Sequence, residues 1–530
     1  MSHMNLDVFL HRLQYDPDKV KPLDWETDWD DAPLPYKLYR GLPLFPLSRE
    51  VPTTLEGRET TGVPILRDIG HFLYYVFGLT QLTQSVMERD TSGESGGILQ
   101  MCRRFVPSGG GLYPSELYLY LKLGELPAGV YHYDAAHHRL ALLREGNFDD
   151  YLGRSLGNRL DANGCFGAAF VSTVYWKNFY KYNNFAYRLQ GLDAGILIGQ
   201  LLEIAKRFGF SSSVHFQYLD QAVNHLLGLS EQEESVYAVI PLSTEPTIRW
   251  MESRNEDEDT VSVSELCREL SSVRHDHYVR SRRIADYPML LRMSEASQLD
   301  SPRLFRQIRK DEQAIPDQAL ALPLPPVDRL SYDLVTVCRN RFSPETEFIW
   351  KPIGLSRLAA LLREATASFS YRNDLDDPQE RPEPRVCIYG CFYGVENVPD
   401  GAYRYDGTAH ALHSVCLGDH RQMMQEGMSL PNINLFQVPL AFHVAGKRSF
   451  FQSQLGKRGY RIQQMEAGML VHRLLLAASA LGMGGRPLLG FDANSSDAIY
   501  RTASRDETGL IFIPVGPYRQ RLRLAGSLSR

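Results

Sequence analysis

The stretch Arg103-Arg104-Phe105-Val106-Pro107-Ser108-Gly109-Gly110-Gly111-Leu112-Tyr113-Pro114-Ser115-Glu116 decides how the rest of the chain is interpreted. Three consecutive glycines stand between a Pro-Ser step and a Leu-Tyr-Pro step, and a strand is predicted over Leu117–Leu123. Glycine has no Cβ, so it accepts positive φ and lets the backbone approach a flat or anionic ligand. N–H groups exposed in such a loop can bind a ring carbonyl, a ring nitrogen or a phosphate. By composition alone, a plain turn before a strand explains the glycines equally well.

The full string, Arg-x-x-Pro-Ser-Gly-Gly-Gly-Leu-Tyr-Pro-x-Glu, resembles the signature of the SagB-type dehydrogenases. These enzymes form a branch of the FMN-dependent nitroreductase superfamily, and the branch includes the azoline oxidases of microcin, cyanobactin and thiopeptide pathways. In that family the glycine loop lies against the flavin. The resemblance therefore implies that Pro107, Ser108, Gly109 and Gly110 contact an FMN cofactor.

The second half of the chain repeats the first. Gly129-Val-Tyr-His-Tyr-Asp134 reappears as Gly401-Ala-Tyr-Arg-Tyr-Asp406, at an offset of 272 residues (401 − 129). Tyr187-Arg-Leu-Gln-Gly-Leu-Asp-Ala-Gly195 reappears as Tyr460-Arg-Ile-Gln-Gln-Met-Glu-Ala-Gly468, at an offset of 273 (460 − 187). A self-similar period this long indicates two copies of a domain, since solenoid repeats are much shorter.

Two copies matter because enzymes of the family that the glycine loop resembles are typically homodimers that bind flavin at the subunit interface. A tandem chain can form such a dimer internally, and its two half-sites are then free to diverge. We therefore predict an α+β fold in which two tandem nitroreductase-like domains form an intramolecular pseudodimer.

The two copies carry complementary parts of one flavin site. The glycine loop belongs to copy one, whereas the corresponding stretch of copy two, Gln379–Pro384, contains no Ser-Gly-Gly. Copy two carries a Gly-rich turn with Gly484 and Gly485 after its long helix, where copy one has Phe208–Ser213. The family uses this turn at the flavin, so we predict one composite site and one FMN per chain.

The resemblance assigns the flavin phosphate to copy two. Its Cys338-Arg339-Asn340-Arg341-Phe342 resembles the arginine-rich family motif that holds the phosphate, and copy one offers only Arg49 at the equivalent place. In extended backbone Arg339 and Arg341 would point the same way, and two guanidinium groups can hold a phosphate by charge-assisted, bidentate hydrogen bonds. A solvent-facing basic pair is the alternative. Arg519, near the C-terminus, matches a place where the family often adds a phosphate contact.

Lys181-Tyr182 is the second chemical signal, placed before a long helix predicted over Arg188–Phe208. Azoline oxidases of the family carry a Lys-Tyr pair there that is implicated in catalysis, and copy two has Gln454 and Leu455 instead. A nearby ammonium would lower the pKa of the Tyr182 phenol and make it a better base. The implied reaction is a two-electron dehydrogenation, in which this base removes a proton and the flavin supplies the redox chemistry. A surface Lys-Tyr pair without function is the alternative.

Composition limits the class of protein. The chain has 530 residues, 43% hydrophobic and 23% charged, which is typical of a globular protein with two to four domains. A net charge of −6 gives no reason to expect nucleic-acid binding, and no apolar stretch approaches about 18 residues, so no membrane span is expected. The seven scattered cysteines and the lack of a signal peptide favour a cytoplasmic protein. The histidines show no metal-ligand spacing, so no metal is expected.

Composition shifts divide the chain into four parts. Residues 1–55 are predicted to be a Pro- and Trp-rich extended arm with few regular elements, 56–250 to be copy one, and 331–530 to be copy two. Residues 251–330 contain an acidic run, Glu256–Asp259, and are predicted to be a helical and Pro-rich linker that wraps the outside. Within the copies we expect a helix over Leu66–Leu79 and strands over Gly129–Asp134, Ala168–Trp176, Tyr237–Leu242 and Val386–Phe392.

The preferred interpretation is an FMN-dependent dehydrogenase that oxidises thiazolines or oxazolines in a ribosomally made peptide. Its partner would be an azoline-containing precursor peptide. Because no separate leader-binding domain is evident, a cyclodehydratase or a leader-binding protein is the candidate to deliver that peptide. Two alternatives stay open: an NAD(P)H-dependent nitro- or enone-reductase, and a non-enzymatic scaffold of a peptide-modifying complex.

Overall fold

Two antiparallel sheets organise the molecule. The computed structural model describes residues 4–22, 25–58, 62–86, 98–245, 261–308, 321–367, 371–377, 384–520 and 525–527. Within these ranges, seven strands form one sheet in the order β1-β6-β5-β4-β7-β9-β8, and seven form another in the order β10-β13-β12-β11-β14-β16-β15. The two orders correspond strand for strand, which confirms the predicted tandem of two domains.

The strands of the two sheets also correspond in length. The first sheet consists of β1 (Leu44–Pro46), β4 (Ser115–Leu121), β5 (Gly129–Asp134), β6 (Arg139–Glu145), β7 (Gly167–Val174), β8 (Ser211–Ser212) and β9 (Glu234–Ser243). The second consists of β10 (Ala321–Pro323), β11 (Val386–Phe392), β12 (Gly401–Asp406), β13 (Ala411–Leu417), β14 (Leu440–Lys447), β15 (Gly484–Gly485) and β16 (Glu507–Gly516). A small third sheet joins β17 (Ala525–Ser527), β2 (Leu79–Val86) and β3 (Ile98–Arg104).

Segments outside the two repeats supply one edge strand of each sheet. β1 comes from the N-terminal arm and pairs with β6, and β10 comes from the linker and pairs with β13. Each contains a proline, Pro46 or Pro323, and proline is tolerated at a sheet edge because its missing N–H faces away from the ladder. The arm also contains the helix α1 (Leu6–Tyr15), so it is more regular than the sequence predicted.

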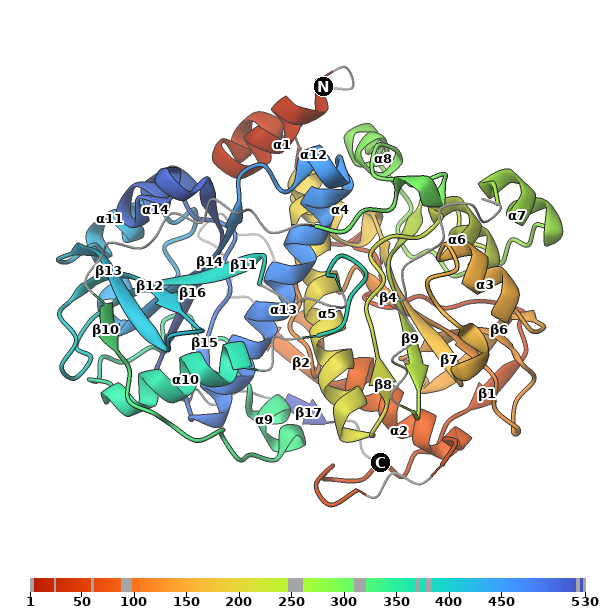
Figure 1. The fold of residues 1–530 in the computed structure, drawn as a ribbon, viewed down its shortest axis with the longest axis horizontal. Coiled ribbons are helices and arrows are strands. Elements are labelled where there is room, and N and C mark those ends of the chain that lie inside the picture. The colour runs from red at the N-terminus through yellow and green to blue at the C-terminus, as the bar shows by residue number, and fades with distance from the viewer. Residues whose placement is uncertain are drawn as a thin grey trace.

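Two long helices, α5 (Ala186–Arg207) and α13 (Arg458–Ala480), run side by side between the sheets (Figure 1). They cross at the paired glycines of the repeat. A Cβ on Gly195 would lie 1.9 Å from the carbonyl oxygen of Met465, and one on Gly468 would lie 2.2 Å from that of Leu192. Only glycine lets the two backbones approach this closely, so the repeated Ala-Gly step marks the pseudo-twofold contact between the copies.

Shorter helices surround the sheets and the two long helices (Figure 1). Those of the first half and the linker are α2 (Leu66–Phe77), α3 (Asp149–Ser155), α4 (Trp176–Tyr182), α6 (Asp220–Leu227), α7 (Val263–Glu269) and α8 (Pro288–Glu295). Those of the second half are α9 (Leu334–Asn340), α10 (Leu355–Ala367), α11 (Arg421–Glu426), α12 (Gln452–Leu455) and α14 (Ala493–Tyr500). Of these, α4 and α12 lie beside α5 and α13, and others cover the outer sides (Figure 1). No helix in the described ranges has the length and apolar character needed to cross a membrane.

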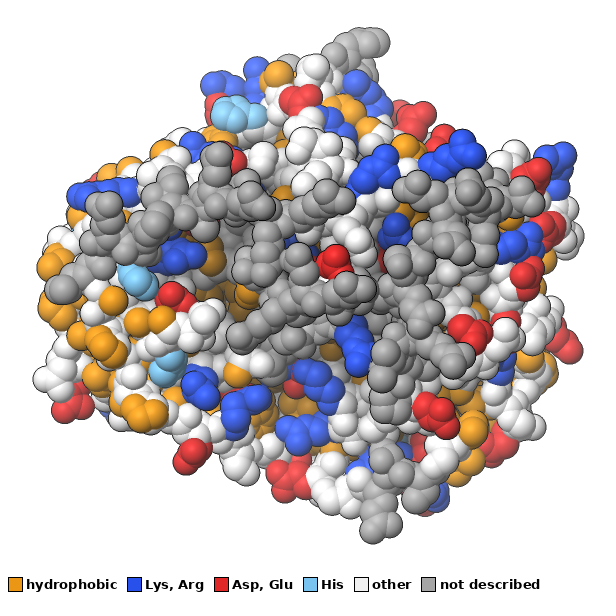
Figure 2. Space-filling view, viewed as in Figure 1, with side chains coloured by type: hydrophobic (Ala, Val, Ile, Leu, Met, Phe, Trp, Pro, Cys, Tyr) orange, Lys and Arg blue, Asp and Glu red, His pale blue; other side chains and the backbone are white. Residues whose placement is uncertain are grey.

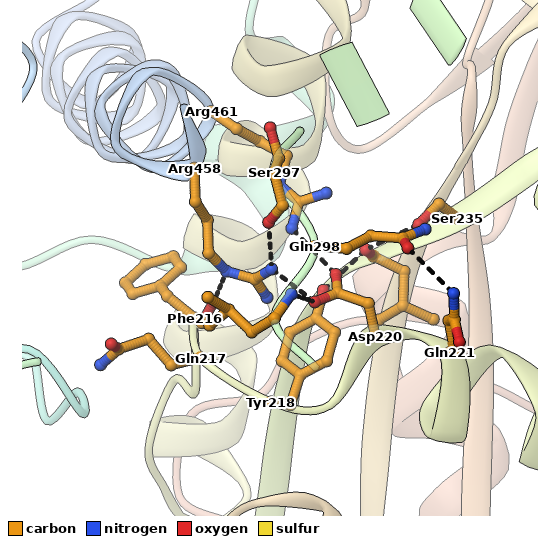
Figure 3. A network of polar contacts seen from close by, with 12 residues as sticks. Phe216, Gln217, Tyr218, Asp220, Gln221, Ser235, Ser297, Gln298, Arg458 and Arg461 are labelled. Carbon is orange, nitrogen blue, oxygen red and sulfur yellow. Dashed lines mark hydrogen bonds and ion pairs between the residues drawn. The ribbon is translucent and has the colours of Figure 1, made fainter. Parts of the chain in front are cut away.

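A buried ionic network fastens the start of α13 to copy one (Figure 3). Arg458 donates to the Asp220 carboxylate at 2.7 Å, to the Phe216 carbonyl at 2.6 Å and to the Ser297 carbonyl at 2.8 Å. Arg461 donates to the other Asp220 oxygen at 3.3 Å. Because Ser297 belongs to the linker, this network joins both copies and the linker at one point.

The predicted elements agree with the structure to within a few residues. The helix expected over Leu66–Leu79 is α2, the one over Arg188–Phe208 is α5, and the strand expected after the glycine loop is β4. Residues 379–383 and the acidic run at 256–259 lie outside the described residues. The domain boundaries near residues 55, 250 and 330 stay a prediction.

Hydrophobic and charged side chains are distributed differently over the surface. On the face drawn in Figure 2, basic and acidic side chains are interspersed, and hydrophobic side chains gather over the edge where β10 and β13 lie. Leu417, at the end of β13, is 58% exposed.

Candidate functional site

Asp193 of α5 holds the glycine loop in place. Its carboxylate accepts hydrogen bonds from Ser108 Oγ at 2.7 Å and from the Gly109 N–H at 3.1 Å, and Ser108 Oγ accepts one from the Tyr113 N–H at 2.9 Å. Burial raises the pKa of Asp193 to about 6. Sequence reasoning missed this residue, although an acid inside the apolar repeat of a long helix was a signal for it.

The glycines are needed for the shape of this loop. Gly110 and Gly111 have φ of +64° and +70°, a left-handed conformation that residues with a Cβ adopt only at a cost. A Cβ on Gly110 would lie 2.6 Å from Tyr182 Oη and 3.1 Å from Lys181 Nζ. The structure thus brings the predicted loop and the predicted Lys-Tyr pair together, and Gly110 leaves room for both functional groups.

Burial, and not the neighbouring ammonium, sets the ionisation of the pair. Burial, together with the charge of the Asp193 carboxylate, raises the pKa of Tyr182 to about 12. Burial also lowers the pKa of Lys181, whose ammonium lies 5.1 Å from the ring centre of Trp29 and 5.0 Å from that of Tyr182. The expectation that Lys181 lowers the pKa of Tyr182 is wrong, because removing the phenol from water outweighs any attraction by the lysine.

Arg103 of copy one reaches across to the arginine motif of copy two. Its guanidinium donates to the backbone carbonyl of Arg339 at 3.3 Å and to that of Arg341. Arg341 is 5% exposed, and its Nε has no hydrogen-bond partner among the described residues. Burial and the charge of Arg103 lower the pKa of Arg341 to about 10. A buried cation without a carboxylate is costly unless an anion pairs with it, which makes Arg341 a candidate ligand for an anion.

The backbone of the arginine motif is not extended, so that prediction is wrong. Arg339 and Asn340 form the last turn of α9 and are exposed, whereas Arg341 follows the helix and is buried. The helical turn separates the two side chains that an extended strand would have aligned. Arg519 is also exposed, and its N–H donates to the Glu347 carbonyl at 2.9 Å. Whether Arg339, Asn340 and Arg519 contact a phosphate stays a prediction.

The Gly484-Gly485 turn is the short strand β15 and packs under this motif. A Cβ on Gly484 would lie 2.4 Å from Pro344, and the Gly485 N–H donates to the Phe342 carbonyl at 3.2 Å. The next residue, Arg486, forms an ion pair with Glu345 at 2.6 Å, and its charge opposes the rise in the pKa of Tyr182. The turn therefore belongs to the same site as the Lys-Tyr pair of copy one.

A cavity of about 500 Å³ lies in copy two. Glu345, the partner of Arg486, lies in its wall, and the other walls are mainly amide and apolar side chains. Its lining consists of Glu345, Thr346, Phe348, Gln425, Pro431, Asn432, Ile433, Asn434, Phe436 and Gln437. Volumes of this order are typical of small-molecule sites.

A buried polar network lies behind the loop and fixes the helix that carries the pair. Lys177, one turn before Lys181 in α4, donates to the Tyr113 carbonyl at 3.2 Å and to the carboxylate of Glu116. The other oxygen of Glu116 contacts His132 Nε2 at 2.9 Å. Loop and helix are thus tied together through Lys177, a link that sequence reasoning also missed.

The equivalent place in copy two is filled by a different cluster. Glu466 stands where copy one has Asp193, and it accepts hydrogen bonds from Arg385 Nε at 2.9 Å and from Tyr371 Oη at 2.6 Å. Arg385 also pairs with Asp376. The side chains of Arg385 and Glu466 are 7% and 2% exposed. Glu466 is therefore engaged with an arginine and a tyrosine, not with a glycine loop.

Comparisons with known proteins agree with this architecture. Residues 84–242 match the model of the Nitroreductase family. A protein from Anabaena variabilis, assigned to the nitroreductases, has the same fold with a TM-score of 0.71 at 20% identity, over 98% of this chain and 100% of that one. The chain is therefore a tandem of two nitroreductase-like domains that form one pseudodimer.

Two further relatives are similar over shorter stretches. The chain is 29% identical over 139 residues to the trifolitoxin-processing protein TfxB of Rhizobium leguminosarum bv. trifolii, which covers 25% of this chain and 37% of that protein. One chain of the E. coli microcin synthetase McbBCD complex, solved with truncated pro-MccB17, matches 36% of this chain and 70% of its own length at 22% identity, with a TM-score of 0.27. The match to the family and to TfxB supports the SagB-type branch that the glycine-loop motif resembles.

Proposed function

We propose that this protein is an FMN-dependent dehydrogenase that oxidises thiazolines or oxazolines in a ribosomally made peptide. The observation that carries the proposal is the convergence of Lys181 and Tyr182 on Gly110 of the glycine loop. The similarity to a trifolitoxin-processing protein supports a peptide as the substrate. A nitroreductase-family domain supports an oxidoreductase.

The residues of the composite site fit a flavin mononucleotide. The phosphate requires a cation, and Arg341 offers a buried guanidinium whose Nε has no partner among the described residues. The ring system requires close backbone approach, and we assign that role to the glycine loop of copy one and to the Gly484-Gly485 turn of copy two. Bound there, the flavin would supply the two-electron redox chemistry.

Lys181 is the better proton acceptor of the pair. Its pKa lies below the usual 10.5, whereas that of Tyr182 is about 12, so the amine loses its proton at a lower pH than the phenol. Neutral Lys181 can then take the proton that leaves the azoline carbon, and the Tyr182 hydroxyl can hold the substrate by a hydrogen bond. The cavity of about 500 Å³ in copy two has room for the heterocycle and its neighbouring residues.

The test is anaerobic single-turnover oxidation of an azoline peptide, followed both by flavin bleaching and by the loss of two hydrogen atoms in the mass spectrum. Lys181→Met should slow bleaching by about 10²–10⁴-fold, the usual contribution of general base catalysis. The aligned control in copy two, Gln454→Ala, should bleach at the wild-type rate. Bleaching by NAD(P)H but not by the azoline peptide would instead establish the nitro- or enone-reductase alternative, and a protein that binds no flavin would establish the scaffold.

A further inference from the structure

A stretch of the linker, Tyr278–Ile284, forms an exposed ridge beside α4, the helix that carries Lys181 and Tyr182. We call this stretch the basic ridge. Its Tyr278 N–H donates to the Leu38 carbonyl at 2.8 Å, so it runs along the N-terminal arm. Ser281 Oγ donates to the Asp31 carbonyl at 2.7 Å and accepts from the indole N–H of Trp176 in α4 at 2.9 Å. The ridge is therefore attached to both the arm and α4.

The ridge presents apolar side chains to solvent. Ser281 is the only buried residue of the seven. Tyr278, Val279 and Ile284 are 43%, 48% and 52% exposed, and Trp29 of the neighbouring arm is 55% exposed. Large apolar side chains gathered on one surface commonly mark a place where another molecule binds.

Three arginines lie between these apolar side chains. Arg280, Arg282 and Arg283 are exposed, and within the described residues none of their guanidinium groups forms an ion pair. The nearby carboxylate of Asp31 accepts hydrogen bonds from the backbone N–H groups of Arg282 and Arg283 instead. The basic side chains belong to the ridge itself, whereas the arm beside it carries exposed Asp28 and Asp30 next to Trp29. The charge of the ridge is complementary to an acidic partner.

The arm that runs beside the ridge reaches the Lys-Tyr pair. The ring of Trp29 is 6.4 Å from that of Tyr180 and 5.1 Å from Lys181 Nζ. Burial raises the pKa of Tyr180, and the charge of Arg280 opposes that rise, so this arginine also faces α4. A peptide lying on the ridge would thus place its next residues at Lys181 and Tyr182.

We propose that the basic ridge docks an acidic segment of the substrate peptide that also carries apolar residues. The inference rests on the proposed function for the identity of the substrate. Seven residues of extended peptide span roughly 23 Å, so the ridge can hold a segment of about its own length. The exposed apolar side chains of the ridge favour an acidic peptide that also carries apolar residues over a nucleic acid.

Fluorescence anisotropy of a labelled twelve-residue peptide of alternating Glu and Leu tests the docking directly. The full-length protein should bind this peptide, and the same peptide with Lys in place of Glu should bind far more weakly. A variant with Arg280, Arg282 and Arg283 changed to Gln should lose about tenfold in affinity, because it removes three exposed ion pairs. Added salt should weaken the wild-type complex more than that of the variant.

The control is a variant with Arg49, Arg67 and Arg363 changed to Gln, which alters the net charge by the same amount. These arginines are exposed and lie on or near β1, α2 and α10, away from α4 and α8 (Figure 1). The control should bind the acidic peptide like the wild type. Equal loss in the two variants, or equal competition by single-stranded polyuridine RNA, would overturn the proposal.

Two substrates separate this inference from the proposed function. A short azoline peptide without acidic residues should be oxidised at the same rate by the wild type and the ridge variant. The same azoline joined to the acidic segment should show a higher KM in the ridge variant and an unchanged kcat. If neither substrate is oxidised but the acidic peptide binds the ridge, the proposed reaction fails and the docking surface stands. If both substrates are oxidised equally by both proteins, the docking surface fails.

Discussion

Replacing Gly110 by alanine separates the two roles of the glycine loop. The new Cβ would lie 2.6 Å from Tyr182 Oη, whereas ordinary contact begins at about 3.4 Å, so the hydroxyl has to move by about 0.8 Å, the difference between these distances. Alanine at a positive φ also costs about 1–2 kcal/mol of folding free energy. A misplacement of about 1 Å can cost 10²-fold in rate, so we expect azoline oxidation to fall by roughly that factor.

Gly111→Ala is a matched control. Gly111 has φ of +70°, close to the +64° of Gly110, so alanine should cost a similar folding free energy there. Its Cβ would meet only the terminal methyl of Met101, at 2.7 Å, and that flexible side chain can move aside. The two variants should therefore lose similar stability, and only Gly110→Ala should lose activity.

The assay combines three measurements on each variant: urea unfolding, the flavin content of the purified protein, and anaerobic flavin bleaching by an azoline peptide. Gly110→Ala and Gly111→Ala should have similar unfolding free energies and similar flavin content. The bleaching rates should differ by about 10²-fold. Equal bleaching rates in the two variants would refute the assignment of Lys181 and Tyr182 to the reaction, because only one variant disturbs them.

Four further predictions follow from the site. Flavin titration should give one FMN per chain, since Glu466 and Arg385 are engaged with each other in the second half, and a ratio near two would contradict the composite site. Arg341→Ala should stay folded but bind flavin roughly tenfold to a hundredfold more weakly, because it loses a charge-assisted hydrogen bond of about 1.5–3 kcal/mol. Unchanged affinity would exclude Arg341 as the phosphate ligand. The rate of azoline oxidation should rise with pH through a pKa below 10.5, because Lys181 must be neutral to accept a proton, and Lys181→Met should abolish that rise. The folded-state pKa of Asp193, about 6, exceeds its usual 3.8, so its contribution to stability is complete below about pH 3.8 and is lost as the pH rises through about 6. Urea unfolding of the wild type should therefore show a loss of up to about 3 kcal/mol over this pH range, and Asp193→Asn should not show it. Identical pH profiles of the two proteins would refute the assignment.

Sequence signals were sufficient for the fold, whereas the cofactor-binding and catalytic residues that they indicate stay a prediction. The repeat spacing predicted two copies of one domain, and the matching strand orders confirm it. The glycine loop and Lys181-Tyr182 are each a few residues long, so their composition was readable without a structure. That these two motifs meet was expected from the family resemblance and is now visible at Gly110.

Properties that depend on solvent exposure and on distant residues were decided only by the tertiary structure. The pKa of Tyr182 rises because the folded chain buries the phenol, and no feature of residues 181 and 182 alone indicates that burial. Arg339 and Arg341 differ because a helix ends between them, which places one guanidinium in solvent and the other in the interior. Asp193 lies 85 residues after Ser108 and joins the site only because α5 passes beneath the loop. The sequence by itself predicted which chemical groups the site contains, whereas their ionisation, burial and partners come from packing between segments that are far apart along the chain.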